Sequence, residues 1–157
     1  MVKVFVLYDS KYGNTKLAAE KILEGMMESS GIETEIACVK EIDPGKLADY
    51  DVLVLGAPNH MGRPSQTMKK FIDRLAEQNL KAKNVAVFGT YAGKEREDRA
   101  VKQLENMAAK KLHSQILISP GLSVRVNGIP GPIVEGELPK CVEFGKQITA
   151  QIKNQTA

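Results

Sequence analysis

Small hydroxyl and amide side chains gather near the N-terminus, between an apolar run and a helical pattern. The stretch LYDSKYGNTKLAAE, residues 7–20, places Ser10, Gly13, Asn14 and Thr15 just before the first helical residues. The N–H groups at a helix start carry partial positive charge and lack intrahelical partners, so such a loop can bind a phosphate. A plain strand–helix turn capped by Asn14 or Thr15 would use the same residues. This stretch alone leaves both interpretations open.

Two later segments have the same character, because each follows an apolar run and combines glycine with uncharged polar residues. They are APNHMGRPS, residues 57–65, and TYAGKE, residues 90–95. Glycine frees the backbone, and amides and hydroxyls make polar contacts without charge. Helix caps would explain some of these residues. Three such loops at one edge of a sheet would instead indicate a ligand site.

The spacing of apolar residues predicts strands that alternate with helices. The predicted strands are residues 2–8, 33–39, 52–57, 85–89, and 116–119 continued by 122–126. Between most of them, apolar residues recur every three or four positions, which is typical of helices that cover a sheet with one side. Residues 41–50 hold at most one short helical turn. Because parallel neighbours need long crossovers, this alternation predicts an α/β fold with a parallel sheet.

The composition of each strand predicts its place in the sheet. The first, third and fourth strands are nearly continuous apolar runs, as expected for strands covered on both faces. The second alternates apolar and polar residues, and the fifth is interrupted by Pro120 and Gly121, which suits edge positions. The predicted order is 2-1-3-4-5. Ligands of such sheets bind beyond the carboxyl ends of the strands, where the winding reverses, and all three polar loops leave that edge.

Size and composition restrict the class of protein. The 157 residues suffice for one domain over 1–157, with 43% hydrophobic and 26% charged residues, as in an ordinary soluble globular protein. The opening MVKVFVLYDS is too short an apolar run for a membrane span and shows no signal-peptide cleavage pattern, so a cytoplasmic location is expected. A net charge of +3 without a basic, aromatic-rich tract gives little support to nucleic-acid binding.

The cysteines and histidines suggest neither a disulfide nor a metal site. Cys38 and Cys141 are far apart and form no C-x-x-C pair, so buried, reduced thiols are expected. His60 and His113 have no visible cluster of carboxylates around them. The sequence also shows no Ser-His-Asp set and no paired carboxylates, and we predict no catalytic residue.

The three loops resemble those of the flavodoxin family in order and spacing. SKYGNT, residues 10–15, resembles the family's phosphate loop, Ser/Thr-x-Thr-Gly-Asn-Thr, and departs from it at Tyr12, where a longer phenol must point differently. VLVLGAPNHMGRPSQTMKKFID is similar to the third strand, flavin loop and helix of flavodoxins and flavodoxin-like quinone reductases. FGTYAG resembles the second flavin loop, and ELPKCVEFGKQI resembles the last helix of flavodoxin modules, including those of flavodiiron proteins. The resemblance spans essentially the whole chain.

This resemblance implies a flavodoxin-like three-layer sandwich with a five-stranded parallel sheet, and FMN as the cofactor. It implies a phosphate site at Ser10, Lys11, Tyr12, Gly13, Asn14 and Thr15, and a ring site at Pro58, Asn59, His60, Met61, Gly62, Thr90, Tyr91, Ala92 and Gly93. Tyr91 is expected to stack on one face of the ring, and His60 or Met61 on the other. The peptide of Gly62 is expected to turn over when the flavin is reduced.

Three functions are compatible with these residues. The first is an electron carrier that shuttles electrons between redox enzymes through FMN. The second is an NAD(P)H:quinone reductase, although such enzymes usually carry longer insertions and the only extra length here is RVNGIPGPIVEGE, residues 125–137, which is more often a surface loop. The third is a flavin-free binding module, but the acidic cluster of receiver domains is not visible. We favour the carrier.

Basic residues flank the predicted flavin loops, whereas flavodoxins generally surround the flavin with acidic residues. They are Lys11, Arg63, Lys94 and Arg96, mixed with Glu95, Glu97 and Asp98. Arg63 is expected to favour the fully reduced flavin, with a simply solvated arginine as the alternative. The mild positive balance also predicts redox partners with an acidic docking face, because charge complementarity steers encounter.

Overall fold

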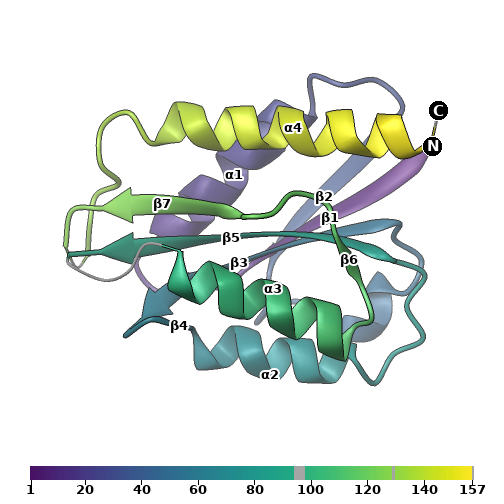
Figure 1. The fold of residues 1–157 in the computed structure, drawn as a ribbon, viewed down its shortest axis with the longest axis horizontal. Helices are drawn as coiled ribbons and strands as arrows, with labels where there is room; N and C mark the ends of the chain where they lie inside the picture. Colours follow the sequence, from purple (N-terminus) through teal and green to yellow (C-terminus); the bar gives the residue numbers. More distant parts are fainter. Residues whose placement is uncertain (94–97, 129, 157) are drawn as a thin grey trace.

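Strands and helices alternate along the chain, as the apolar spacing predicts (Figure 1). The structure is a computed structural model that describes residues 1–93, 98–128 and 130–156. The strands are β1 (Val2–Tyr8), β2 (Ile32–Cys38), β3 (Val52–His60), β4 (Arg63–Pro64), β5 (Asn84–Ala92), β6 (Gln115–Ile116) and β7 (Leu122–Val126). The helices are α1 (Asn14–Met26), the short 3-10 helix η1 (Pro44–Leu47), α2 (Gln66–Leu75), α3 (Arg99–Lys111) and α4 (Leu138–Thr156).

The strands form a single twisted sheet whose order is β2-β1-β3-β5-β6. All neighbours along this path are parallel, β7 also pairs in parallel with β5, and β4 pairs antiparallel with the end of β3. Because β5 is the fourth predicted strand and β6 and β7 make up the fifth, the predicted order 2-1-3-4-5 is confirmed. The carboxyl ends of β1, β3 and β5 therefore meet at one edge.

The fifth predicted strand is divided where proline and glycine interrupt it. Residues between β6 and β7 are held by the buried Glu105 of α3. Its carboxylate accepts hydrogen bonds from the Gly121 N–H (2.9 Å) and from the Ser119 hydroxyl (3.3 Å). β7 then continues beside β5 as far as the Ala92–Val126 pair. The division thus lets the last strand reach the edge that carries the three polar loops.

Two apolar cores lie on opposite faces of the sheet. Figure 1 shows α1 and α4 on one face and α2 and α3 on the other. Alternate residues of a strand point to opposite faces, so Phe5 and Leu7 pack with Phe71 of α2, whereas Val4 and Val6 pack with Ile22 of α1. The predicted three-layer sandwich is confirmed. Across the described ranges, no helix combines the length and apolarity that crossing a membrane requires.

Helices α1 and α4 approach closely because each has a glycine where they meet. A Cβ on Gly25 would lie 2.0 Å from the carbonyl oxygen of Val142, and one on Gly145 would lie 2.1 Å from that of Ile22. Any larger residue would force the helices apart. This contact fixes α1, whose first turn follows the first polar loop.

Two strands extend further than the sequence predicted. β3 ends at His60 rather than Ala57, and β5 ends at Ala92 rather than Gly89. The Pro58–Thr90 pair continues the parallel ladder, and β3 then turns back into β4. The two turn residues, Met61 and Gly62, have φ angles of +55° and +83°. Positive φ at both positions is typical of a tight two-residue hairpin, so the segment predicted as a loop is largely a β-hairpin.

Candidate functional site

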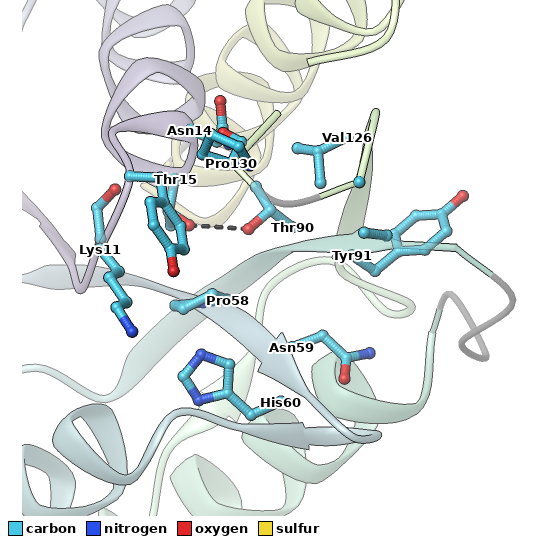
Figure 2. Close-up of a pocket in the computed structure, with 14 residues that line it drawn as sticks. Lys11, Asn14, Thr15, Pro58, Asn59, His60, Thr90, Tyr91, Val126 and Pro130 are labelled. Atoms are coloured by element: carbon cyan, nitrogen blue, oxygen red, sulfur yellow. Dashed lines mark hydrogen bonds between the residues drawn. The ribbon is translucent and has the colours of Figure 1, made fainter. Parts of the chain in front are cut away.

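The carboxyl ends of β1, β3 and β5 border one cleft (Figure 2). Its lining consists of Ser10, Lys11, Tyr12, Asn14, Thr15, Pro58, Asn59, His60, Thr90, Tyr91, Ala92, Val126, Gly128 and Pro130. The space inside it, counted together with its open mouth, is about 510 Å³. The fold therefore brings the three polar loops together around one open cleft.

Four of the predicted site residues do not line this cleft. Gly13 precedes α1 with a φ of +92°, and its N–H donates to the Ser10 hydroxyl oxygen at 3.0 Å. Met61 lies at the tip of the hairpin with its side chain 89% exposed, whereas Gly62 beside it is buried. Gly93 follows β5 with a φ of +66°. These residues shape the backbone around the cleft.

The first loop leads directly into the N-terminus of α1. The first turn of this helix is formed by Asn14, Thr15, Lys16 and Leu17, which bring no acidic side chain near the helix start. N–H groups in a first turn lack intrahelical acceptors, and the helix dipole adds partial positive charge. The Ser10 hydroxyl still has its proton to donate after accepting from Gly13. This end of the cleft is chemically suited to an anion such as a phosphate.

Side-chain hydrogen bonds connect the first loop to two other segments. The hydroxyls of Thr15 and Thr90, both almost fully buried, lie 2.8 Å apart (dashed in Figure 2). The Asn14 side-chain amide donates to the Pro130 carbonyl at 2.7 Å. These bonds hold the loop after β1, the end of β5 and the segment after β7 at fixed spacing. Asn14 was predicted as a phosphate contact, and the structure also makes it the link to a segment far along the chain.

The segment after β7 is a wall of the cleft that the sequence prediction missed. Val126, Gly128 and Pro130 line the cleft, although this Gly/Pro-rich stretch was interpreted as a surface loop. Gly131 has a φ of +111°, and a Cβ there would lie 2.5 Å from the Asn14 side-chain nitrogen, so only glycine fits this contact. The available signal was the position of the stretch, directly after a strand that ends at the ligand edge.

The aromatic side chains of the cleft differ in how they are covered. Tyr91 is only 6% exposed, and the Arg125 guanidinium lies 5.3 Å from the centre of its ring. Figure 2 shows this ring extending away from Thr15. Tyr12 is 51% exposed, with the Lys11 ammonium 5.3 Å from its ring centre, and His60 is exposed at the opposite wall. The stacking roles assigned to Tyr91, and to His60 or Met61, stay predictions.

Only one end of the Asn59 side-chain amide has a hydrogen-bond partner among the described residues. Its side-chain oxygen accepts the Gly62 N–H at 2.6 Å, while its Nδ2 is buried without a hydrogen-bond partner among the described residues. A buried donor left unpaired costs free energy until an acceptor arrives, whether from water or from a ligand. Because Asn59 lines the cleft, this orphaned donor fits a ligand that carries acceptor atoms at its rim, as a flavin ring does.

Basic side chains lie at and beside the described part of the cleft. Lys11 lines it, Arg63 lies on β4, and Arg99 covers Gly62, with its Cδ 2.9 Å from where a Cβ on that glycine would be. The predicted flanking residues Lys94 and Arg96, with Glu95 and Glu97, lie outside the described residues. In the part of the chain that the structure describes, no group of three or more His, Cys, Asp or Glu side chains could hold a metal ion.

Known proteins share both the sequence pattern and the fold. The family described as Flavodoxin matches residues 6–140. A flavodoxin from Clostridium saccharobutylicum is 35% identical over 89 residues, which cover 57% of this chain and 56% of that protein. A flavodoxin from Aquifex aeolicus is 40% identical over 73 residues, covering 46% of this chain and 40% of that protein. The matched part of the chain thus spans about half the length of these curated relatives, or less.

A solved structure described as a flavodoxin from the domain Archaea has the same fold. It superimposes with a TM-score of 0.79 at 24% identity, covering 97% of this chain and 99% of that chain. The family match runs from β1 into α4 and includes all three polar loops. Proteins of this family bind FMN. From the strand order, the cleft and this match over most of its length, the chain belongs to the flavodoxin family.

Proposed function

We propose that the chain binds FMN in the described cleft and carries electrons between redox enzymes. The observation that carries this proposal is the meeting of a helix N-terminus, an unpaired buried amide and two strand ends around one space. FMN combines a phosphate dianion with a flat ring that has polar edges, and it supplies one- and two-electron chemistry when bound. Both parts of such a molecule have suitable partners here.

The phosphate would be held at the first loop. The Ser10 and Tyr12 hydroxyls and the free N–H groups that open α1 are the donors, and Lys11 adds a positive charge. Thr15 and Asn14 keep the neighbouring segments in place through their bonds to Thr90 and Pro130. Because this cradle relies mostly on fixed uncharged donors, little rearrangement is needed when the anion binds.

The ring would lie at the carboxyl ends of the paired strands β3 and β5. Pro58, Asn59 and His60 form one wall, and Thr90, Tyr91 and Ala92 the other. The Asn59 Nδ2 would gain the acceptor it lacks. The exposed side chains of Tyr12 and Met61 near the mouth leave an apolar rim to which another protein can bind, and the basic residues Lys11 and Arg63 favour a partner with an acidic docking face.

Absorption spectroscopy and FMN titration of the cofactor-free protein test this proposal. We expect a yellow protein on purification, and quenching of FMN fluorescence that saturates at one FMN per chain. NADH or NADPH is then added with menadione: a carrier shows negligible turnover unless a separate reductase is present. A protein that stays colourless in excess FMN contradicts the proposal and favours a flavin-free module. Rapid turnover without a reductase favours a quinone reductase.

A further inference from the structure

The tip of the β3–β4 hairpin is held at two neighbouring peptide groups by two different side chains. The Gly62 N–H belongs to the Met61–Gly62 peptide and donates to the Asn59 side-chain oxygen at 2.6 Å. The Gly62 carbonyl belongs to the next peptide and accepts from the side-chain amide of Gln103 at 3.1 Å. Asn59 comes from β3 and Gln103 from α3, so two elements fix this short turn.

The Gly62 carbonyl is directed at α3 and not at the cleft. Gln103, its donor, does not line the cleft, and neither does Gly62 itself. The hydrogen bond is partly buried, which makes its donor costly to leave unpaired. The carbonyl is nevertheless close to the cleft, because Asn59 and His60, three and two residues before Gly62, line it.

We propose that Gln103 is a positioning residue: it holds the Gly62 carbonyl away from the cleft and so sets how readily bound FMN accepts its first electron. This inference rests on the proposed function. Hydrogen bonds to the ring nitrogens are among the means by which a protein tunes a bound flavin. The Gly62 carbonyl is an acceptor next to the cleft wall, and the Gln103 side chain binds it.

The peptide that must rotate is the one that Gln103 holds. Turning the Gly62–Arg63 peptide leaves the preceding peptide bonded to Asn59, so the rest of the tip keeps its anchor. Glycine at position 62 permits the backbone change that a side chain would resist. The rotation also turns the Arg63 N–H away from its pairing position opposite His60. The free energy lost with this pairing is the same whether or not Gln103 is present.

The proposed exchange of hydrogen bonds accompanies uptake of one electron and one proton. The electron comes from the donor protein and the proton from solvent, and together they create a new N–H on the ring. The Gly62 carbonyl leaves the Gln103 amide and accepts a hydrogen bond from that N–H. Gln103 opposes the first reduction because its own bond must break. The carbonyl has already turned before the second reduction, so the equilibrium constant of that reduction is little affected by Gln103.

The variant Gln103→Met removes the donor and keeps a side chain of similar length. Asn106→Met, an exposed amide on the same helix, is the matched control. We expect Gln103→Met to raise the equilibrium constant of the first one-electron reduction roughly two- to ten-fold, the range for one neutral hydrogen bond. The constant of the second reduction should stay near that of the unmodified protein, and Asn106→Met should change neither. Spectroelectrochemical titration of the FMN-loaded proteins measures both constants.

Nuclear magnetic resonance of the cofactor-free protein gives a second readout. The Gln103 side-chain amide should exchange slowly with water, and Gln103→Met should shift the Arg63 amide resonance more than Asn106→Met does. If the unmodified protein binds FMN but the two variants give equal reduction constants, the inference is wrong while the proposed function stands. If the unmodified protein binds no FMN, both are wrong. An amide of Gln103 that exchanges as fast as an exposed one also overturns the inference.

Discussion

Arg63 occupies a position at the hairpin where its charge can act on the cleft without lining it. It is exposed on β4 and pairs with His60, a cleft residue. A positive charge favours the more negative, fully reduced form of a flavin. Arg63→Glu should therefore lower the potential of the second reduction, by roughly 90 mV or less, because an exposed charge contributes at most about 1 kcal/mol and the substitution changes two charge units.

Redox titration of Arg63→Glu beside Lys46→Glu checks this prediction. Lys46 is exposed on η1, which precedes β3 and so lies at the other end of the sheet. The same change of charge there should leave the potential close to that of the unmodified protein. Equal shifts in both variants would mean that only the net charge matters. No shift in Arg63→Glu would mean that this arginine is simply solvated.

The two cysteines should differ in reactivity. Burial raises the pKa of the Cys141 thiol to about 12, with a further increase from nearby Glu137, and this side chain is fully buried. Cys38 is partly exposed at the end of β2. Alkylation requires the thiolate, so iodoacetamide at pH 8 should modify Cys38 at least tenfold faster than Cys141. Peptide mass spectrometry measures both, and equal rates in the folded protein would contradict the structure.

Single residues of the site were predictable where their chemistry is local. Ser10 precedes α1 and Thr15 lies in its first turn, and both line the cleft. Their local pattern is compatible with a helix cap or a phosphate site, and the predicted strand order then favoured the ligand edge. The bond from Asn14 to the Pro130 carbonyl joins residues that are 116 positions apart, and no local pattern specifies it. The Gln103 bond to Gly62 is of the same kind. Contacts between distant loops depend on the three-dimensional course of the chain.

At the scale of elements, Glu137 connects the last strand to the last helix. Its carboxylate accepts from the Arg125 N–H at 2.8 Å and pairs with Lys140 at 2.7 Å. Burial by itself would raise the pKa of Glu137, but the hydrogen bonds from Lys140 and Arg125 outweigh it, so the pKa lies below its usual value. A lowered pKa adds stability above the unfolded-state pKa, and that stability is lost as the pH falls through the folded-state pKa.

Glu137→Gln should therefore cost about 1–3 kcal/mol of unfolding free energy at pH 7, as expected for a hydrogen-bonded charge. The difference from the unmodified protein should begin to shrink as the pH falls below about 4.3, the usual pKa of a glutamate, and should vanish below the lowered folded-state pKa, where the carboxylate is protonated in both states. Urea unfolding at pH 7, 5 and 3.5 measures this difference in unfolding free energy. Glu143→Gln, an exposed site on α4, is the control and should be nearly neutral. A cost that does not vary with pH would exclude the charge as its cause.

The segment between β7 and α4 should contribute to cofactor binding as a unit. Gly131→Ala would force a Cβ against the Asn14 amide and displace the Pro130 wall. Gly136→Ala is a matched control, because Gly136 also has positive φ (+92°) but has open space around it. Both variants should lose about 1 kcal/mol through backbone strain.

We expect only Gly131→Ala to weaken FMN binding, by roughly tenfold, or about 1.4 kcal/mol. Titration of the cofactor-free proteins with FMN, followed by fluorescence quenching, gives the dissociation constants. If both variants bind FMN equally well, this segment is not part of the site. Equal weakening in both would instead point to a general loss of stability.

The elements themselves could be predicted more fully than their ends. Apolar periodicity located every helix that covers the sheet, because one buried face is a property of the local sequence. The ends of β3 and β5 were missed because the apolar runs stop at Ala57 and Gly89, whereas pairing with the neighbouring strand continues to Pro58 and Thr90. The hairpin tip was missed for a related reason, since Met61 is an unusual residue for positive φ.

At the scale of the whole molecule, charge and shape together decide which partners can approach. The net charge is +3, and the described residues around the cleft include Lys11, Arg63 and Arg99. Such a field should attract anionic partners and repel cationic ones over about one Debye length, roughly 8 Å at physiological salt. A cytoplasmic location and a single domain over the whole chain stay predictions, because neither follows from the charge distribution or from the fold.

Two small oxidants of opposite charge test the sign of this field without a natural partner. The FMN-loaded, reduced protein is mixed with ferricyanide, an anion, or with hexaammineruthenium(III), a cation, in a stopped-flow spectrometer. We expect the ferricyanide rate constant to fall several-fold between about 20 and 300 mM salt, and the rate constant with the cation to rise, because salt screens attraction and repulsion alike. Arg63→Glu should reduce both slopes. A ferricyanide rate that rises with salt would show that the cleft presents negative charge to its partners, and a partner with a basic docking face would then be the better fit.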